Sequence, residues 1–329
     1  MSKLNPIAQH LVKEPKGILA ADESTPSMNK RLAKVGVEGT EEDRRKFREI
    51  LITAKGVEEF LSGIILFDET IRQLDSNGKK FTDILKEKGI AIGIKVDQGT
   101  VPMSDSPEEV TTKGLDGLAE RLAEYKAMGA VFTKWRSVIR IGANMPSKAC
   151  LEANAQGLAQ YASIVQKAGL VPILEPEVLL EGDHTIEQAE KVTTETLKTV
   201  FAACKKHKVD LTGLLLKSSM VLPGSTSGQD VSPEEIAQAT INCFKNSVPK
   251  SVPGIVFLSG GQTPEQASEN LYEICKLEKE PWQTTFSFSR ALEEPVLEAW
   301  HGAEANIEPA QEIFYNLCKR NSEARMGKF

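Results

Sequence analysis

Long hydrophobic runs and closely spaced metal-binding side chains are both missing from this 329-residue sequence. No stretch approaches the ~20 consecutive apolar residues that a membrane-spanning helix needs. The four histidines are not paired with one another or with cysteine at the spacing of zinc ligands; they are His10, His184, His207 and His301. We therefore expect no membrane contact, no bound metal and no metal cofactor.

The chain also lacks an excess of positive charge. It has 40 Lys and Arg against 46 Asp and Glu, a formal net charge of −6. Because a protein that binds the nucleic-acid backbone needs clustered basic residues to neutralise phosphates, we expect no nucleic-acid partner. Any anion that this protein binds must be held by a local group of residues.

Cysteine is sparse, and its positions do not suggest disulfides. The five residues are far apart, and Cys204 shares an apolar helical stripe with Val200 and Phe201; the positions are Cys150, Cys204, Cys243, Cys275 and Cys318. The first 16 residues contain no apolar segment of the kind found in secretory signals. This pattern predicts reduced core thiols in a cytoplasmic protein.

What the sequence does contain is a series of eight short apolar runs, each of them ending at a polar or charged residue. They cover residues 18–21, 64–67, 91–96, 131–133, 170–174, 214–216, 255–258 and 284–288. Such runs are typical of strands buried on both faces of a parallel sheet, and segments with helical spacing lie between them. The alternation predicts an α/β fold: a single (β/α)₈ TIM barrel over residues 1–329 with extra N- and C-terminal helical segments.

Three segments begin in the same way, with a hydroxyl residue, a proline and then Glu or Gln at the third helical position. They start at Ser106, Ser232 and Thr263, and the pattern predicts a capping box and a helix at each. The glycine-rich dinucleotide fingerprint is missing, which favours a closed barrel over an open doubly wound sheet.

In a barrel of this kind the chemistry lies at the carboxyl ends of the strands. The polar residues found there include three lysines, and their convergence is not a routine outcome of packing because a buried ammonium carries a desolvation cost. The set is Asp22, Asp68, Lys95, Asp97, Lys134, Arg136, Glu175, Glu177, Lys217, Ser259, Ser289 and Arg290.

One of these lysines is a candidate nucleophile. A lysine has an ordinary pKa near ~10.4, and this pKa must fall by about 3.4 units, or about 4.6 kcal/mol, for the amine to be half neutral at pH 7. Repulsion from a second ammonium ~5 Å away supplies about 3 kcal/mol of this amount. Lys217 paired with Lys134 would meet this condition without a metal. Lys217 follows three consecutive leucines and so has the most buried stem.

Glu175 and Glu177 are two residues apart and would point to the same side of an extended strand. Imine chemistry needs protons to be delivered and removed, which carboxyl groups of unequal pKa can do. The alternative is that both residues only neutralise the lysines.

Two groups of residues are candidates for phosphate binding. A Ser-Gly-Gly turn before a capped helix, together with an arginine after the last strand, resembles the phosphate site that barrels often place after strands seven and eight. The first group is Ser259, Gly260, Ser289 and Arg290, and the second, across the mouth, is Lys95, Arg136, Ser24 and Ser27. Two sites around an amine nucleophile predict a bisphosphate substrate.

The chain resembles the class I fructose-bisphosphate aldolases along nearly its whole length. The matching blocks are GILAADEST (17–25), GIKVD (93–97), KWR (134–136), VPILEPE (171–177), LLK (215–217), FLSGGQ (257–262) and RAL (290–292).

The resemblance implies that Lys217 forms the Schiff base, that Glu175 dehydrates the carbinolamine and that Glu177 and Lys134 assist it. It implies that Asp22 takes the C4-hydroxyl proton, and that the two groups of phosphate-binding residues hold the 1-phosphate and the 6-phosphate in turn. The products would be dihydroxyacetone phosphate and glyceraldehyde 3-phosphate, and the enzyme would be a cytoplasmic homo-oligomer, a tetramer or a dimer.

Three departures accompany the resemblance. Ser218-Ser219 follow the imine lysine where many members have Pro-Asn, and Ser289 stands where many have glycine. No C-terminal tyrosine is present to move the C3 proton, so that step would fall to a carboxylate or to substrate phosphate.

Three other functions remain open at the level of sequence. A related Schiff-base enzyme acting on another phosphorylated ketose would keep its activity when Lys95 and Arg136 are neutralised. A non-catalytic scaffolding relative would not be trapped by borohydride, and a metal-dependent aldolase would lose its activity in chelator.

Overall fold

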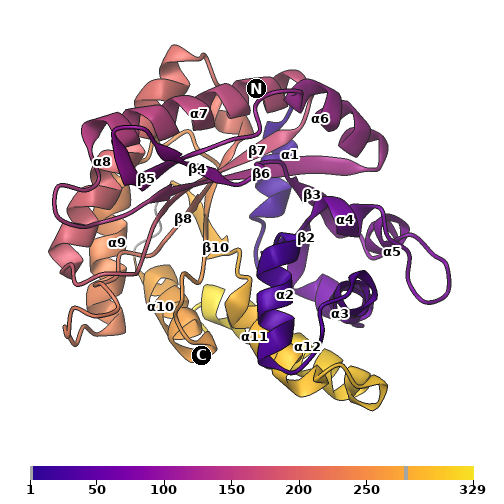
Figure 1. Ribbon diagram of the computed structural model, residues 1–329. Coiled ribbons are helices and arrows are strands. Elements are labelled where there is room, and N and C mark those ends of the chain that lie inside the picture. The colour runs from indigo at the N-terminus through magenta and orange to yellow at the C-terminus, as the bar shows by residue number, and fades with distance from the viewer. Residues whose placement is uncertain (1–2, 278–280) are drawn as a thin grey trace.

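Eight parallel strands form one sheet that closes on itself (Figure 1). The computed structural model describes residues 3–277 and 281–329, so residues 1–2 and 278–280 of the predicted domain lie outside the described residues. The Ala20 amide donates a hydrogen bond of 2.9 Å to the Phe288 carbonyl, which joins the first strand to the segment after the last. In sheet order the strands are β1 (Gly17–Ala21), β2 (Leu61–Leu66), β3 (Ala91–Lys95), β6 (Ala130–Ile139), β7 (Val171–Val178), β8 (Leu215–Ser218), β9 (Gly254–Phe257) and β10 (Gln283–Phe286). All eight predicted strands are confirmed.

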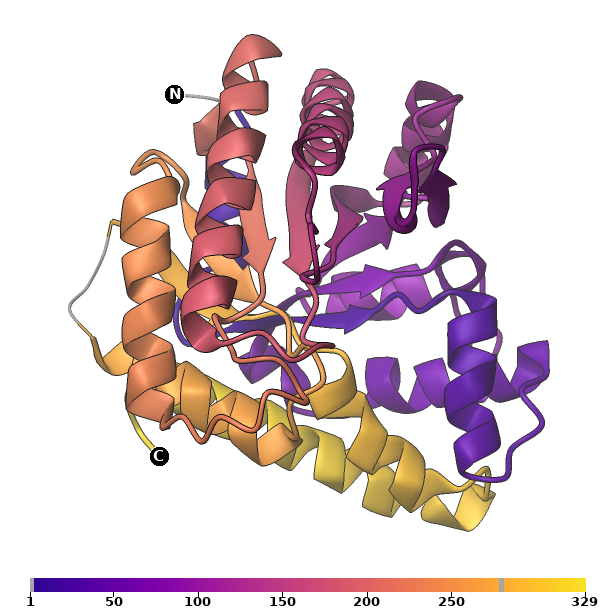
Figure 2. The same cartoon turned by 60° about the vertical axis from the view of Figure 1, so that its left-hand side comes forward.

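Helices surround the barrel, and α11 and α12 lie side by side outside it in both views (Figures 1 and 2). The predicted terminal helical segments are confirmed, and no described helix is long and apolar enough to cross a membrane. The helices are α1 (Asn5–Leu11), α2 (Thr25–Lys34), α3 (Glu41–Thr53), α4 (Asp68–Ile71), α5 (Phe81–Glu87), α6 (Leu118–Ala127), α7 (Lys148–Lys167), α8 (Ile186–Lys206), α9 (Pro233–Ser247), α10 (Pro264–Lys276), α11 (Arg290–Trp300) and α12 (Ile307–Arg325), with short 3₁₀ turns at Val57–Glu59, Leu211–Gly213 and Glu304–Asn306.

Two of the three predicted capping boxes are confirmed, at Ser232 and at Thr263. The third was wrong, because Ser106–Thr112 is strand β5, which pairs antiparallel with β4 (Thr100–Met103). The Glu109 carboxylate accepts a 2.6 Å hydrogen bond from the Ser147 amide at the start of α7 instead of capping a helix of its own. The β-branched residues that follow Glu109 favour a strand, and tertiary contacts decide the outcome.

The barrel interior explains why the candidate residues face one pocket. Alternate strand residues, among them Ala20, Phe132, Ile173 and Leu215, form a core inside the barrel, and the residues between them pack outward against the helices. Side chains along a strand alternate with a period of two. The next inward positions are therefore Asp22, Lys134, Glu175 and Lys217.

The prediction that polar residues end the strands was only partly right. Strands β6 and β7 continue to Ile139 and Val178. Lys134 and Glu175 therefore lie within regular strands, whose hydrogen bonds fix the backbone on both sides. This placement gives the two side chains a more rigid support than a loop would.

Gly93 lies where the ring of Phe132 fills the barrel, and a Cβ added to this glycine would overlap that ring. We expect Gly93→Ala to lower the free energy of unfolding by about 1–3 kcal/mol through overpacking. Gly157, inside α7, has no atom within 4 Å of a new Cβ; the matched Gly157→Ala should raise it by about 0.5–1 kcal/mol through helix propensity. Urea titration measures both, and equal effects would contradict the packing argument.

Candidate active site

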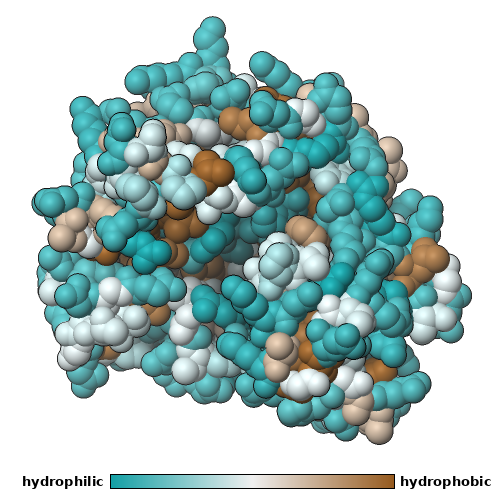
Figure 3. Space-filling model, viewed as in Figure 1, coloured by the Kyte–Doolittle hydropathy of each residue, from teal (hydrophilic) through white to brown (hydrophobic). Residues whose placement is uncertain are grey.

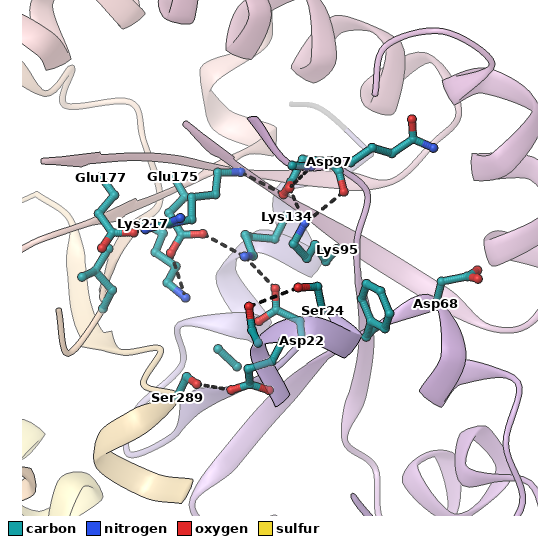
Figure 4. Close-up of a pocket in the computed structure, with 18 of the residues that line it drawn as sticks. Asp22, Ser24, Asp68, Lys95, Asp97, Lys134, Glu175, Glu177, Lys217 and Ser289 are labelled. Atoms are coloured by element: carbon teal, nitrogen blue, oxygen red, sulfur yellow. Dashed lines mark hydrogen bonds and ion pairs between the residues drawn. The ribbon is translucent and has the colours of Figure 1, made fainter. Parts of the chain in front are cut away.

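All thirteen predicted site residues line one pocket of about 950 Å³ (Figures 3 and 4). Figure 3 shows the surface hollowed near the centre of this face, with mostly hydrophilic residues around the hollow. The residues are Asp22, Ser24, Ser27, Lys95, Lys134, Arg136, Glu175, Glu177, Lys217, Ser259, Gly260, Ser289 and Arg290. The barrel thus brings together side chains from positions 22 to 290 of the sequence.

A continuous chain of ion pairs crosses the floor of the pocket (Figure 4). The Lys134 ammonium lies 2.6 Å from Asp22 Oδ2 and 3.0 Å from Glu175 Oε2. The other oxygen of Glu175, Oε1, lies 3.2 Å from Lys217 Nζ. All four residues are at most 6% exposed. A carboxylate therefore bridges the two ammonium groups. The sequence predicted repulsion between Lys217 and Lys134 but not this bridge.

These contacts set the charges of the two central groups. Burial alone would raise the pKa of Glu175, but the positive charges of Lys134, Lys217 and Arg136 lower this pKa to about 2. Burial alone would lower the pKa of Lys134, but Asp22 and Glu175 raise it above its ordinary value. The free protein at neutral pH therefore holds an ionised Glu175 and a positively charged Lys134.

The side of the pocket near β3 and β6 carries two further ion pairs. The Arg136 guanidinium pairs with Glu177, and the Lys95 ammonium pairs with Asp97. The backbone amide of Arg136 also donates to the Asp97 carboxylate over 3.2 Å, which fixes the two strands relative to each other. Burial lowers the pKa of the Arg136 side chain, but the charge of Glu177 more than offsets it.

The opposite side is suited to bind an anion. Gly260 and Gly261 have φ values of 58° and 95°, in the left-handed region that favours glycine. A Cβ on Gly261 would lie 3.6 Å from Arg290 Nη1, so this turn passes directly beside the guanidinium. Within residues 3–277 and 281–329, no side chain forms a hydrogen bond or ion pair with the guanidinium of Arg290. This arginine also begins α11, whose N-terminal amides favour negative charge.

Sequence reasoning missed several polar side chains that line this pocket, among them Glu23, Arg31 and Ser287. Glu23 and Arg31 belong to it, and Ser24, Ser27 and Arg31 recur at helical spacing, which was a usable signal. The hydroxyl of Ser287 is fully buried and has no partner among the described residues. Because such a hydroxyl is costly to leave unsatisfied, it is available to a ligand in the pocket.

Other expectations concern groups away from the pocket. The five cysteines are free, and four of them are buried, as predicted for core thiols. Across the described ranges, no three His, Cys, Asp or Glu side chains lie together in a way that could hold a metal ion.

The sequence of the whole chain matches a known enzyme family. The family model for class I fructose-bisphosphate aldolases, described as glycolytic, matches residues 3–329. The chain belongs to the class I fructose-bisphosphate aldolases. The predicted TIM barrel, the lyase class and the fructose-bisphosphate aldolase activity are confirmed.

Individual aldolases match over nearly the whole chain. The cytosolic fructose-bisphosphate aldolase 4 of Arabidopsis thaliana is 49% identical over 95% of this chain and 80% of its own length. Fructose-bisphosphate aldolase B of Homo sapiens is 48% identical over 99% and 90%, and the probable class 1 enzyme of Xanthomonas campestris is 46% identical over 100% and 99%. The solved aldolase of Plasmodium falciparum superposes with a TM-score of 0.98 at 43% identity, over 99% of this chain and 94% of that one.

Proposed function

We propose that this aldolase cleaves fructose 1,6-bisphosphate to dihydroxyacetone phosphate and glyceraldehyde 3-phosphate through an imine on Lys217. The observation that carries the proposal is the chain of ion pairs Lys217–Glu175–Lys134–Asp22 on the pocket floor. Cationic side chains stand at both ends of the pocket, which suits a substrate with two phosphates.

The first step moves one proton over the 3.2 Å between Lys217 and Glu175. The transfer leaves a neutral amine that attacks the substrate ketone, and it converts Glu175 to an acid. Because the charge on Lys217 helps to lower the pKa of Glu175, neutralising Lys217 makes this carboxyl a better proton holder. Glu175 then gives the proton to the carbinolamine hydroxyl, which leaves as water to form the imine.

Cleavage follows at the other end of the ion-pair chain. Asp22 takes the proton of the C4 hydroxyl, the C3–C4 bond breaks, and the bonding electrons pass into the imine to give an enamine. Glyceraldehyde 3-phosphate departs, a protonated carboxylate or the substrate phosphate gives a proton to C3, and water then hydrolyses the imine and releases dihydroxyacetone phosphate from Lys217. Lys134 holds Asp22 and Glu175 in place at 2.6 and 3.0 Å, and Glu177 orients Arg136.

The two phosphates would be held by different means. Ser259, Gly260, Arg290 and the backbone of Ser289 would bind the 1-phosphate. Within residues 3–277 and 281–329 no side chain forms a hydrogen bond or ion pair with Arg290, which supports this role. Lys95, Arg136, Ser24 and Ser27 would bind the 6-phosphate. Because Lys95 and Arg136 are already paired with carboxylates, the 6-phosphate must share or displace those partners.

The domain organisation, the oligomeric state and the cellular location are also part of this proposal. We propose that residues 1–329 act as one barrel domain and that the enzyme is a homo-oligomer, a tetramer or a dimer. We also propose a cytosolic location, which is supported by the plant relatives that are named cytosolic.

Borohydride trapping tests the proposed function. Reduction in the presence of dihydroxyacetone phosphate and chelator should add one substrate-derived mass to the intact protein, and peptide mapping should place it on Lys217. The imine is the only species in this scheme that borohydride makes permanent. An unmodified protein, or an adduct on another lysine, would rule out the proposed chemistry.

A further inference from the structure

A second buried group of charges lies directly beside the pocket. It consists of Glu23, Arg31, Arg48, Ser289 and Glu293, and we name it the carboxylate cluster. Arg31 Nη1 lies 2.6 Å from Glu23 Oε1 and 2.8 Å from Glu293 Oε2. Arg48 pairs with Glu23 and lies 3.0 Å from Glu293 Oε1. The side chains of both carboxylates are at most 7% exposed, so each depends on these partners.

The Ser289 hydroxyl is at the centre of this cluster. It donates a short hydrogen bond to Glu23, lies 3.2 Å from both terminal nitrogens of Arg31, and lies 3.3 Å from Glu293 Oε2. A glycine at this position could make none of these contacts. Three segments meet at the hydroxyl: the loop between β1 and α2, helix α2 itself and the start of α11.

The position of Ser289 in the chain gives these contacts a consequence for the site. Ser289 is the residue before Arg290, and its carbonyl accepts the Leu292 and Glu293 amides that begin α11. Glu23 is the residue after Asp22. The Ser289–Glu23 hydrogen bond therefore links the neighbour of Arg290, the proposed phosphate ligand, to the neighbour of Asp22, the proposed base.

The charge state of the cluster favours this bond over the alternative bond to Glu293. Burial would raise the pKa of Glu23, but Arg48 and Arg31 hold it well below its usual range. Burial and the charge of Glu23 raise the pKa of Glu293 well above its usual range. Negative charge is therefore favoured on Glu23, which is also the closer of the two carboxylates to the Ser289 hydroxyl, so Ser289 donates to Glu23.

We propose that the Ser289 hydroxyl is a positioning group for the aldolase reaction, which fixes the Arg290 end of the pocket relative to Asp22. The inference rests on the proposed function for its link to the 1-phosphate. It concerns a side chain that glycine, common at this position in the family, does not provide. The hydroxyl acts through the backbone of the following residue and through Glu23, without touching the reacting atoms.

Ser289→Ala tests this role by comparing the two substrates in the condensation direction. Dihydroxyacetone phosphate carries the phosphate assigned to Arg290, whereas glyceraldehyde 3-phosphate carries the other. We expect the KM for dihydroxyacetone phosphate to rise about tenfold, the effect of losing one hydrogen bond to a charged group. The KM for glyceraldehyde 3-phosphate and kcat should change less than twofold, and Ser289→Thr, which keeps the hydroxyl, should restore the parent values.

Two controls separate the hydroxyl from the charges around it. Glu293→Gln keeps nearly the same side-chain shape and leaves the Ser289–Glu23 hydrogen bond in place, so this variant should keep the parent KM. The dissociation constant of inorganic phosphate, measured by calorimetry against an Arg290→Met baseline, should rise in Ser289→Ala. This second measurement needs no catalysis, so it tests the positioning role even if the proposed function fails.

Several results would overturn the proposal. Unchanged affinity for both inorganic phosphate and dihydroxyacetone phosphate in Ser289→Ala would show that the hydroxyl positions nothing. A fall in kcat alone, or equal rises in both KM values, would assign a general structural role. A Glu293→Gln variant with the same defect as Ser289→Ala would place the effect in the charge cluster. If the parent enzyme is not trapped by borohydride while its phosphate affinity responds to Ser289→Ala, only the proposed function fails.

Discussion

Replacing Lys217 with alanine is expected to abolish the borohydride adduct and to lower kcat by about 10⁴- to 10⁶-fold, the range seen when a catalytic nucleophile is removed. The side chain is 3% exposed at the end of β8, and its amine touches the one carboxylate, Glu175, that can take and return its proton. Among the described residues no other lysine shares this arrangement beside the pocket floor, because Lys134 is held between two carboxylates. Intact mass and steady-state kinetics measure the two effects.

Lys95→Met is the matched control for that experiment, since it removes a lysine charge from the same pocket. Dihydroxyacetone phosphate lacks the 6-phosphate that Lys95 is proposed to meet, so this variant should still be trapped while its KM for fructose 1,6-bisphosphate rises. An adduct that persists in Lys217→Ala would mean that another amine is the nucleophile. An adduct that disappears in Lys95→Met would mean that loss of charge alone explains the result.

The structure gives a physical reason why one of two neighbouring lysines is suited to be the nucleophile. Lys134 has a carboxylate on each side, at 2.6 and 3.0 Å, and these carboxylates raise its pKa. Lys217 has a single carboxylate neighbour at 3.2 Å. Because each paired carboxylate favours the charged form of an amine, Lys134, with two such neighbours, is suited to remain a fixed positive charge. Lys217, with one, is the better placed of the two lysines to act as the nucleophile.

Much of this site could be predicted from the sequence, because side chains along a strand point alternately to its two faces. Apolar residues such as Phe132 and Leu215 identify the inward face, and the same parity places Lys134 and Lys217 two residues further on. The count of eight strands alternating with helices then predicts that the sheet closes into a barrel. The positions of residues that depend only on this alternation can therefore be predicted from the sequence.

Other features could not be found in this way because they depend on contacts between distant segments. The capping pattern at Ser106 was misleading, since Glu109 is used by the start of α7 about forty residues later. The carboxylate cluster joins side chains from the loop after β1 and from α2, α3 and the start of α11, and no local pattern in the sequence relates Arg48 to Glu293. The bridging position of Glu175 between two lysines is also a matter of register between β6, β7 and β8.

Lys134→Met is expected to lower the free energy of unfolding by about 3–5 kcal/mol at pH 7, because it leaves Asp22 and Glu175 buried without their shared cation. In the parent the pKa of Glu175 is lowered from 4.5 to about 2, a difference worth about 3 kcal/mol. That stability is present above the unfolded pKa and is lost as the pH falls through the folded pKa of about 2.

The variant should show the opposite dependence on pH. Without Lys134 the pKa of Glu175 rises, so between pH 4 and 7 the buried carboxyl groups must ionise against burial and the free energy of unfolding falls as the pH rises. Urea titrations at pH 4, 5.5 and 7 measure this, with Lys148→Met as the control: the Lys148 side chain is 86% exposed, its partner Glu152 lies 3.7 Å away, and its loss should cost less than about 1 kcal/mol at every pH. A deficit in Lys134→Met that is the same at pH 4 and pH 7 would show that lost packing, and not the loss of the cation shared by Asp22 and Glu175, is the cause.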